Sequence, residues 1–135
     1  MRSPAQAGSM LLVLTDERAA ASLSAGISRV APDLGLCHAR DRQEVLRAQP
    51  FPSVIVLDLD MACDSAFEIL SWARSQPLYR WVPVIGLTSP GRSRADRAYA
   101  LGANCCLLKP SEAAQMDGIA QGIGAYASLL TKQPS

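Results

Sequence analysis

The sequence is poor in histidine and has no cluster of basic residues. It holds one histidine, His38, and four cysteines, none of them in a C-x-x-C pair, which excludes a recognisable zinc site. The cysteines are better explained as buried, reduced thiols. Thirteen basic and twelve acidic residues leave a formal net charge of +1, and the basic residues are scattered along the chain. We therefore expect no binding to nucleic acid or to an anionic membrane.

The sequence also lacks a long apolar run. No segment reaches the roughly 18 apolar residues of a membrane span, and the opening MRSPAQAGS has no apolar signal core. A chain of 135 residues is long enough for one compact domain. We expect a cytoplasmic domain over residues 10–131, with flexible tails at 1–9 and 132–135.

Short apolar runs alternate with longer segments of helical character. This alternation is typical of βα units arranged around a parallel sheet. The predicted strands are 10–15, 34–39, 53–58, 82–88 and 105–109, and the predicted helices are 16–31, 41–49, 65–76, 93–101 and 111–130. The fold class is therefore α/β.

Local signals mark several helix ends. Asp41 fits an N-cap, Ser65 and Glu68 fit an S-x-x-E capping box, and Gly102 fits a left-handed helix stop.

The last predicted helix contains Gly118, Gly122 and Gly124, which each cost about 1 kcal/mol relative to alanine. Gly118 and Gly122 have G-x-x-x-G spacing. We interpret this spacing as close packing rather than as a dimer motif.

Polar side chains follow the predicted strands at their carboxyl ends. Asp16 follows the first strand, Asp58 and Asp60 the third, Thr88 the fourth and Lys109 the fifth. In an open parallel sheet these ends meet at one edge, where ligands bind. The combination of carboxylates, a hydroxyl and one ammonium group suits Mg²⁺ beside an anionic group.

Lys109 is the most informative single residue. The chain has only two lysines against eleven arginines, yet a lysine ends an apolar strand. A compact point charge suits contact with a phosphate group. Pro110 follows, and a cis peptide bond there would turn the lysine inward.

Four motifs in order resemble those of response regulator receiver domains. They are VLTDE, VIVLDLDM, VPVIGLTS and LGANCCLLKP, and together they cover roughly residues 10–130. The segment YALGANCCLLKP is also similar to receivers that partner phytochrome-type histidine kinases. The resemblance implies a flavodoxin-like (βα)5 three-layer sandwich with a five-stranded parallel sheet in the order 2-1-3-4-5. It also implies a phosphorelay signalling domain rather than an enzyme. The only catalytic activities that it implies are Mg²⁺-dependent self-phosphorylation and autodephosphorylation.

The resemblance assigns roles to individual residues. Asp58 matches the phosphoacceptor, Thr88 the hydroxyl that contacts the phosphoryl group, and Lys109 the lysine that pairs with it. Asp16, Asp58 and the backbone carbonyl of Asp60 match the Mg²⁺ ligands. The implied reaction is transfer of a phosphoryl group to Asp58 from the phosphohistidine of a histidine kinase or phosphotransfer protein. A receiver without an output domain would then signal through protein–protein contacts.

The chain departs from the family pattern at several positions. Thr15 replaces the first of two adjacent acids, so we expect weaker Mg²⁺ binding. Asp60 is an added acid that shares a face with Asp58, and this like-charge pair should raise the pKa of one of them. Cys106 replaces the aromatic switch residue. Ala62, Cys63 and Ala66 replace the usual Pro, Gly and Gly of the next loop, which leaves its conformation open.

Other readings of the sequence stay open. A pseudo-receiver would act as an interaction module that is never phosphorylated, and Thr15 and Cys106 favour it. A small-molecule enzyme is disfavoured because the chain has no Gly-rich phosphate loop. A redox role for Cys105 and Cys106 is disfavoured because neighbours in a strand face opposite ways. A homodimer through the fourth helix, fifth strand and fifth helix is compatible with the resemblance, although Asn104 and Cys105 replace the usual acids there.

Overall fold

The computed structural model describes residues 8–90, 94–110 and 115–131, with side chains as far as residue 129. Its strands are β1 (Ser9–Val13), β2 (Gly35–Ala39), β3 (Val54–Asp58), β4 (Val84–Thr88) and β5 (Cys105–Leu108). They form one parallel sheet in the order β2-β1-β3-β4-β5. The predicted α/β class, strand order and parallel topology are therefore confirmed.

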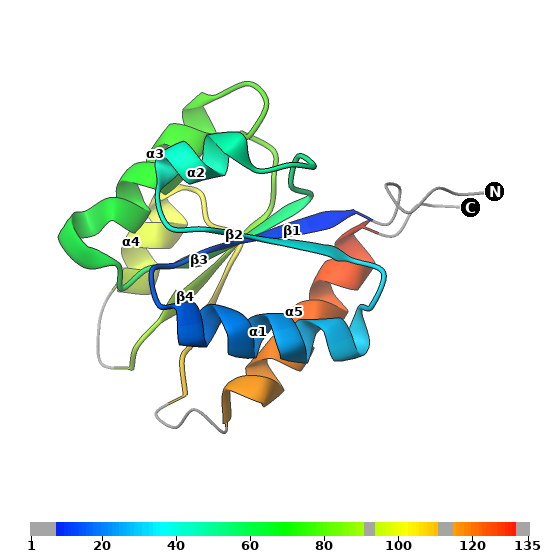
Figure 1. Cartoon of the computed structure of the whole chain (residues 1–135). Coiled ribbons are helices and arrows are strands. Elements are labelled where there is room, and N and C mark those ends of the chain that lie inside the picture. The colour runs from blue at the N-terminus through cyan, green and yellow to red at the C-terminus, as the bar shows by residue number, and fades with distance from the viewer. Residues whose placement is uncertain (1–7, 91–93, 111–114, 132–135) are drawn as a thin grey trace.

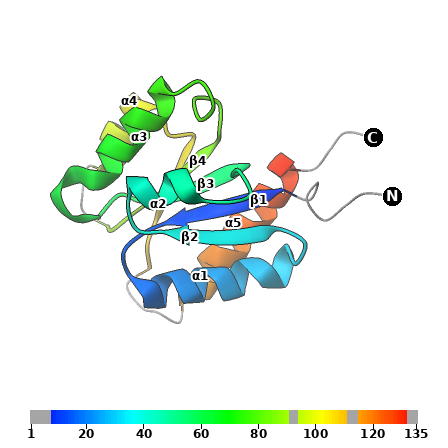
Figure 2. The ribbon, with the colours of Figure 1, turned by 45° about the horizontal axis from the view of Figure 1, so that its top comes forward.

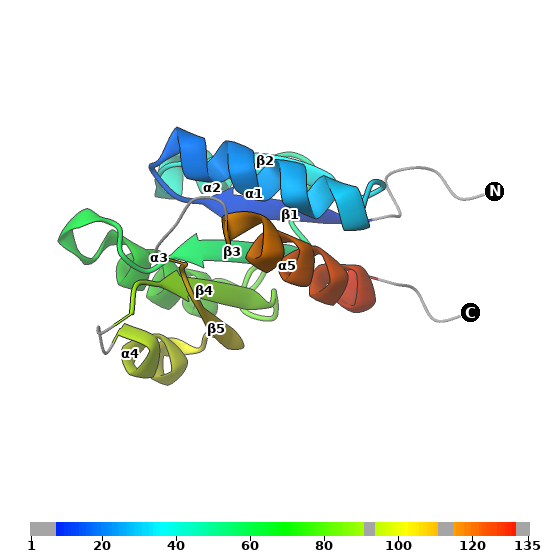
Figure 3. The same cartoon turned by 90° about the horizontal axis from the view of Figure 1, so that it is seen from below.

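The helices cover both faces of the sheet. They are α1 (Glu17–Val30), α2 (Arg42–Arg47), α3 (Ser65–Ser75), α4 (Arg94–Leu101) and α5 (Met116–Thr131). Helices α1 and α5 lie side by side on one face, and α2, α3 and α4 lie on the other (Figure 1 and Figure 2). The view from below shows α1 and α5 running across the sheet (Figure 3). The three-layer sandwich is confirmed, and none of the described helices is long and apolar enough to cross a bilayer.

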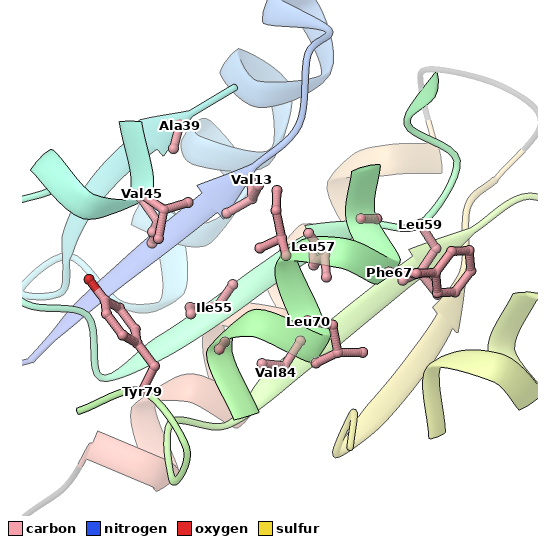
Figure 4. Close-up of a cluster of buried hydrophobic side chains, with 14 of the residues drawn as sticks. Val13, Ala39, Val45, Ile55, Leu57, Leu59, Phe67, Leu70, Tyr79 and Val84 are labelled. Atoms are coloured by element: carbon pink, nitrogen blue, oxygen red, sulfur yellow. The ribbon is translucent and has the colours of Figure 1, made fainter. Parts of the chain in front are cut away.

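The three central strands are buried along their whole length. Every residue of β1, β3 and β4 is buried, because helices cover both of their faces. Alternate side chains enter two separate cores. One core joins Val13, Ile55 and Leu57 to residues of α2 and α3 (Figure 4). The other joins Met10, Leu12, Val54 and Val56 to residues of α1 and α5.

Two helix caps confirm or extend the sequence signals, and a third signal is wrong. Asp41 caps α2, accepting a hydrogen bond from Glu44 N, and Asp16 caps α1 in the same manner. The capping box at Ser65 does not form. Ser65 is the first helical residue, and its hydroxyl donates to Ala62 O at 2.7 Å.

The loop before α3 explains why that box is absent. Cys63 and Asp64 both have left-handed backbones, with φ of 59° and 58°, so the chain turns sharply just before Ser65. Each left-handed non-glycine residue costs roughly 1 kcal/mol. This is the loop in which Cys63 takes a position usually held by another residue type.

Gly102 and Pro110, which lie on either side of β5, carried sequence signals about the backbone conformation. Gly102 has φ of +111°, which confirms the predicted left-handed stop after α4. The peptide bond before Pro110, whose isomer the sequence left open, is not cis; within the described residues the one cis peptide bond precedes Pro50.

The four cysteines are free thiols, but they are less buried than expected. Cys63 is exposed, and Cys37, Cys105 and Cys106 are only partly buried. The side chain of Cys105 packs on the α1 and α5 face of the sheet and that of Cys106 on the opposite face. These neighbours therefore face opposite sides of the sheet, as predicted, and form no disulfide.

Gly118 and Gly122 of α5 do not lie at a close helix contact, although their G-x-x-x-G spacing suggested one. A Cβ added at Gly118 or Gly122 would meet nothing within 4 Å, so the interpretation of their spacing as close packing is wrong. The close contact lies at Gly124, where an added Cβ would come within 2.5 Å of Val30 Cγ2. Helix α1 approaches α5 there and at Gly26, where an added Cβ would overlap Ala120 Cβ.

Alanine substitutions in α5 should therefore have opposite signs. Gly118→Ala and Gly122→Ala are each expected to raise the free energy of unfolding by about 1 kcal/mol, because alanine favours the helix and meets no obstacle. Gly124→Ala is expected to lower it by roughly 1–3 kcal/mol through overpacking against Val30. Urea unfolding of the three variants measures these changes. A loss of stability in Gly118→Ala would show that its face is covered.

Candidate functional site

The carboxyl ends of β3, β4 and β5 bring the predicted site residues together. Asp58 ends β3, Thr88 ends β4, and Lys109 directly follows β5. The parallel register pairs Asp58 with Leu87 and Thr88 with Leu108, so the three residues lie at one level of the sheet. Asp58 is 7% exposed and Thr88 is 1% exposed. Polar groups this deeply buried require partners.

Lys109 is the central partner of the site. Its Nζ lies 2.6 Å from Asp58 Oδ1 and 3.1 Å from Asp60 Oδ2, and its backbone N–H donates to Thr88 O at 2.8 Å. Partial burial alone would lower the pKa of Lys109, but the hydrogen bonds and charges of Asp58 and Asp60 raise it overall. The ammonium group is therefore firmly charged between two carboxylates.

The carboxylate of Asp58 is engaged on one side only. Asp58 Oδ1 accepts from Lys109 Nζ and from the backbone N–H of Asp60 at 3.0 Å. Among the residues that the structure describes, none makes a hydrogen bond or ion pair with Asp58 Oδ2. A carboxylate with one oxygen fixed and the other unengaged can serve as an oriented nucleophile.

The carboxylate of Asp60 points toward the end of β4. Asp60 Oδ2 accepts from the backbone N–H of Ser89 at 2.9 Å and from the Ser89 hydroxyl at 2.6 Å. Asp60 Oδ1 accepts from the Thr88 hydroxyl at 3.3 Å. The sequence placed this carboxylate on the rim beside Asp58, where it could restore the charge that Thr15 lacks or repel a phosphodonor. It did not predict contacts with Thr88 and Ser89.

These donors lower the pKa of Asp60, whereas the sequence predicted a raised pKa for one of Asp58 and Asp60. Its burial alone would raise the pKa, but hydrogen bonds from Ser89 and Lys109 outweigh burial and lower the pKa overall. The like-charge pair therefore does not raise the pKa of Asp60. Lys109 lies between the two acids and offsets their repulsion.

Arg94 is a site residue that the sequence did not reveal. It is the first residue of α4, and its Nη1 donates to Leu59 O at 3.0 Å. Its Nε lies 3.7 Å from Asp60 Oδ1, and its Nη1 lies 3.9 Å from Asp64 Oδ1. The guanidinium also lies over the ring of Phe67. No short motif links an arginine after β4 to an acid after β3, which is why pattern reading missed it.

Cys106, which stands where the family has an aromatic residue, lies next to the aromatic residue Tyr99. The backbone N–H of Cys106 donates to the hydroxyl of Tyr99, which belongs to α4, at 2.9 Å. The Cys106 side chain lies over Gly86, where an added Cβ would approach its Sγ to 3.2 Å. Burial raises the pKa of the Cys106 thiol. Cys106 therefore fills a packed position on β5 and is a poor redox group.

Asp16, one of the predicted metal ligands, has a structural role as well. Asp16 caps α1, accepting both backbone hydrogen bonds on Oδ1. The described residues contain no group of three or more His, Cys, Asp or Glu side chains that could hold a metal ion. Two carboxylates, Asp16 and Asp58, remain as side-chain donors, each with one oxygen outside the contacts above. This donor set still fits Mg²⁺, which takes one or two carboxylates and completes its shell with water.

Comparison with solved structures identifies the fold. The Mn²⁺-bound form of response regulator Rcp1 matches at 23% identity and a TM-score of 0.80, covering 95% of this chain and 99% of that one. The phosphorylated cyanobacterial phytochrome response regulator RcpA matches at 22% identity and a TM-score of 0.79, with the same coverage. A receiver domain from Rhodospirillum rubrum matches at 21% identity and a TM-score of 0.77, covering 90% of this chain and 94% of that one.

Sequence comparisons add no further relative. No family model matches the chain, and no curated protein matches it. The structural likeness confirms that the chain has the fold of response regulator receiver domains, as the four motifs predicted.

Proposed function

We propose that the protein is a receiver domain that accepts a phosphoryl group on Asp58 and signals through protein–protein contacts. The observation that carries the proposal is the 2.6 Å contact between Lys109 Nζ and Asp58 Oδ1 at the buried end of β3. This contact pairs a carboxylate nucleophile with a cation able to neutralise an incoming phosphoryl group. The fold supports the same function.

The proposed step is a phosphoryl transfer. An oxygen of Asp58 attacks the phosphorus of a phosphohistidine, the P–N bond breaks, and its electron pair returns to the imidazole. The product is an acyl phosphate on Asp58. Lys109 holds Asp58 in position and faces the new negative charge, while Thr88 supplies a hydroxyl at the adjacent strand end.

A divalent cation belongs to this proposal. Asp16, Asp58 and the backbone carbonyl of Asp60 would hold Mg²⁺, which would neutralise charge on the transferring group. Thr15 supplies no carboxylate and the Asp60 side chain faces Ser89, so we expect weaker binding than three acids would give.

The proposed partners follow from the same resemblance. RcpA is described as a phytochrome response regulator, and we propose a histidine kinase of the phytochrome type, or a phosphotransfer protein, as the cytoplasmic donor. We also propose the face of α4, β5 and α5 as the dimer surface. Leu108, Tyr126 and Leu129 are exposed there, 60%, 38% and 73% respectively.

A pseudo-receiver is the second candidate, and one observation favours it. The Asp60 carboxylate already engages Thr88, Ser89 and Lys109. In a protein that is never phosphorylated, these contacts would fix one conformation of the site and leave the surface constitutively available to a partner.

Intact-mass spectrometry after incubation with acetyl phosphate and Mg²⁺ separates the two candidates. The unmodified sequence is expected to gain one phosphate adduct that hydroxylamine removes, because hydroxylamine cleaves acyl phosphates. Asp58→Asn is expected to gain none. Asp64→Asn is the matched control, because it removes an acid of the same loop whose side chain is 53% exposed. No adduct on either the unmodified sequence or the control would favour the pseudo-receiver.

A further inference from the structure

The carboxylate of Asp60 is surrounded by hydrogen-bond donors. Lys109 Nζ, the backbone N–H of Ser89 and the hydroxyls of Ser89 and Thr88 all bind it, at 2.6 to 3.3 Å. Charge-assisted donors converging on one group form an anion-binding site, here named the anion pocket. In the present structure the anion is a side chain of the same chain.

The anion pocket is also the place where a phosphoryl group on Asp58 would need donors. Lys109 contacts Asp58 and Asp60 at once, so an anion attached to Asp58 and the Asp60 carboxylate would compete for it. Two anions in one partly buried pocket repel each other strongly. One of them must leave for the other to bind.

We infer that Asp60 is an internal substitute for the phosphoryl group. Its carboxylate holds Thr88, Ser89 and Lys109 together in the unmodified protein and is displaced when Asp58 is phosphorylated. The displacement rests on the proposed function, whereas the holding role does not.

Arg94 provides the second position for the displaced carboxylate. Arg94 Nε lies 3.7 Å from Asp60 Oδ1, and the guanidinium is anchored on Leu59 O. Because Arg94 begins α4, movement of Asp60 toward it changes the charge environment of that helix end. Phosphorylation is thereby coupled to α4 without an aromatic residue at position 106.

Beryllofluoride, which mimics a phosphoryl group on aspartate, tests the displacement. Its affinity in the presence of Mg²⁺ is measured by titration for the unmodified sequence, Asp60→Asn and Asp33→Asn. Asp60→Asn removes the competing charge but keeps the side-chain shape, and we expect binding about tenfold tighter, as removal of about 1.4 kcal/mol of repulsion would give. Asp33→Asn makes the same charge change at an exposed residue before β2, away from both the anion pocket and Arg94, and is expected to bind as the unmodified sequence does.

Hydrogen exchange tests the holding role without any phosphoryl group. Asp60→Ala removes the acceptor of the Ser89 N–H, so exchange at this amide is expected to be at least about tenfold faster than in the unmodified sequence. Asp60→Asn, which keeps a side-chain oxygen, is expected to protect this amide better than Asp60→Ala, and Asp64→Asn should leave it unchanged.

The two measurements separate the failure of each idea. Equal beryllofluoride affinity in the unmodified sequence and Asp60→Asn would overturn the displacement, and unchanged Ser89 exchange in Asp60→Ala would overturn the holding role. Absence of beryllofluoride binding in all variants, including Asp60→Asn, would overturn the proposed function, and Ser89 exchange would then decide the inference alone.

Discussion

Replacing Lys109 with methionine is expected to lower the free energy of unfolding at neutral pH by about 3 kcal/mol, the usual loss when one partner of a mostly buried ion pair is removed. Methionine fills similar space without a charge. The side chains of Asp58 and Asp60 are only 10% and 15% exposed, and they would then face each other without the ammonium group between them. Urea unfolding measures the loss.

The pH dependence of Lys109→Met should identify the cause. In the unmodified protein the raised pKa of Lys109 contributes stability that is present below its ordinary pKa and is lost as pH rises through the folded value. The lowered pKa of Asp60 contributes stability that is present above its ordinary pKa and is lost as pH falls through the folded value. In Lys109→Met, the loss of stability at alkaline pH that comes from deprotonation of Lys109 should be absent. The deficit of this variant should also shrink on acidification, because protonation of Asp60 removes the repulsion between the two carboxylates.

Arg29→Met is the control for Lys109→Met. Arg29 pairs with Asp117, but their side chains are 62% and 40% exposed. An exposed pair of this kind contributes less than about 1 kcal/mol. Equal losses in the two variants, or a Lys109→Met deficit that is the same at acidic and neutral pH, would contradict the role assigned to Lys109.

Sequence reasoning located the site because parallel strands constrain it strongly. Once VIVLD and VIGLT are strands of one parallel sheet, the side chains that follow them must meet at one edge, and Asp58, Thr88 and Lys109 do so. The caps at Asp16 and Asp41 are set by local hydrogen bonds, and the Asp41 cap could be read from the residues around it. These features depend on periodicity or on neighbours within a few residues.

The features that sequence reasoning missed depend on contacts between distant segments. The strand geometry ends at Asp58, so the alternation of faces no longer fixes the direction of Asp60, and donors from Ser89 and Lys109 fix it instead. The spacing of Gly118 and Gly122 gave no indication of whether a neighbour covers them, because that depends on how α1 crosses α5. Arg94 reaches the site from a helix 35 residues away from the carbonyl that it binds.

Arg74 is a clear case of a distant contact with a large expected effect on stability. It belongs to α3, and its guanidinium donates to four oxygens of two neighbouring loops, at 2.9 to 3.2 Å. The acceptors are the carbonyls of Gly102, Tyr79 and Val82 and the side chain of Asn104. Burial lowers the pKa of Arg74, since all four of these acceptors are neutral. One side chain thereby joins the loop before β4 to the turn before β5.

Arg74→Met is expected to lower the free energy of unfolding by about 4 kcal/mol, because the partly buried carbonyls of Gly102 and Val82 lose their guanidinium donor. Arg74→Lys keeps the charge but cannot reproduce the planar set of donors, so we expect it to recover less than half of the loss. Arg80→Met is the control: Arg80 is an exposed residue that lies over the ring of the exposed Trp81, and its loss should cost under about 1 kcal/mol. Urea unfolding gives all three values. If lysine restored full stability, the charge of Arg74 would matter rather than its geometry, and the arrangement of the two loops would have another cause.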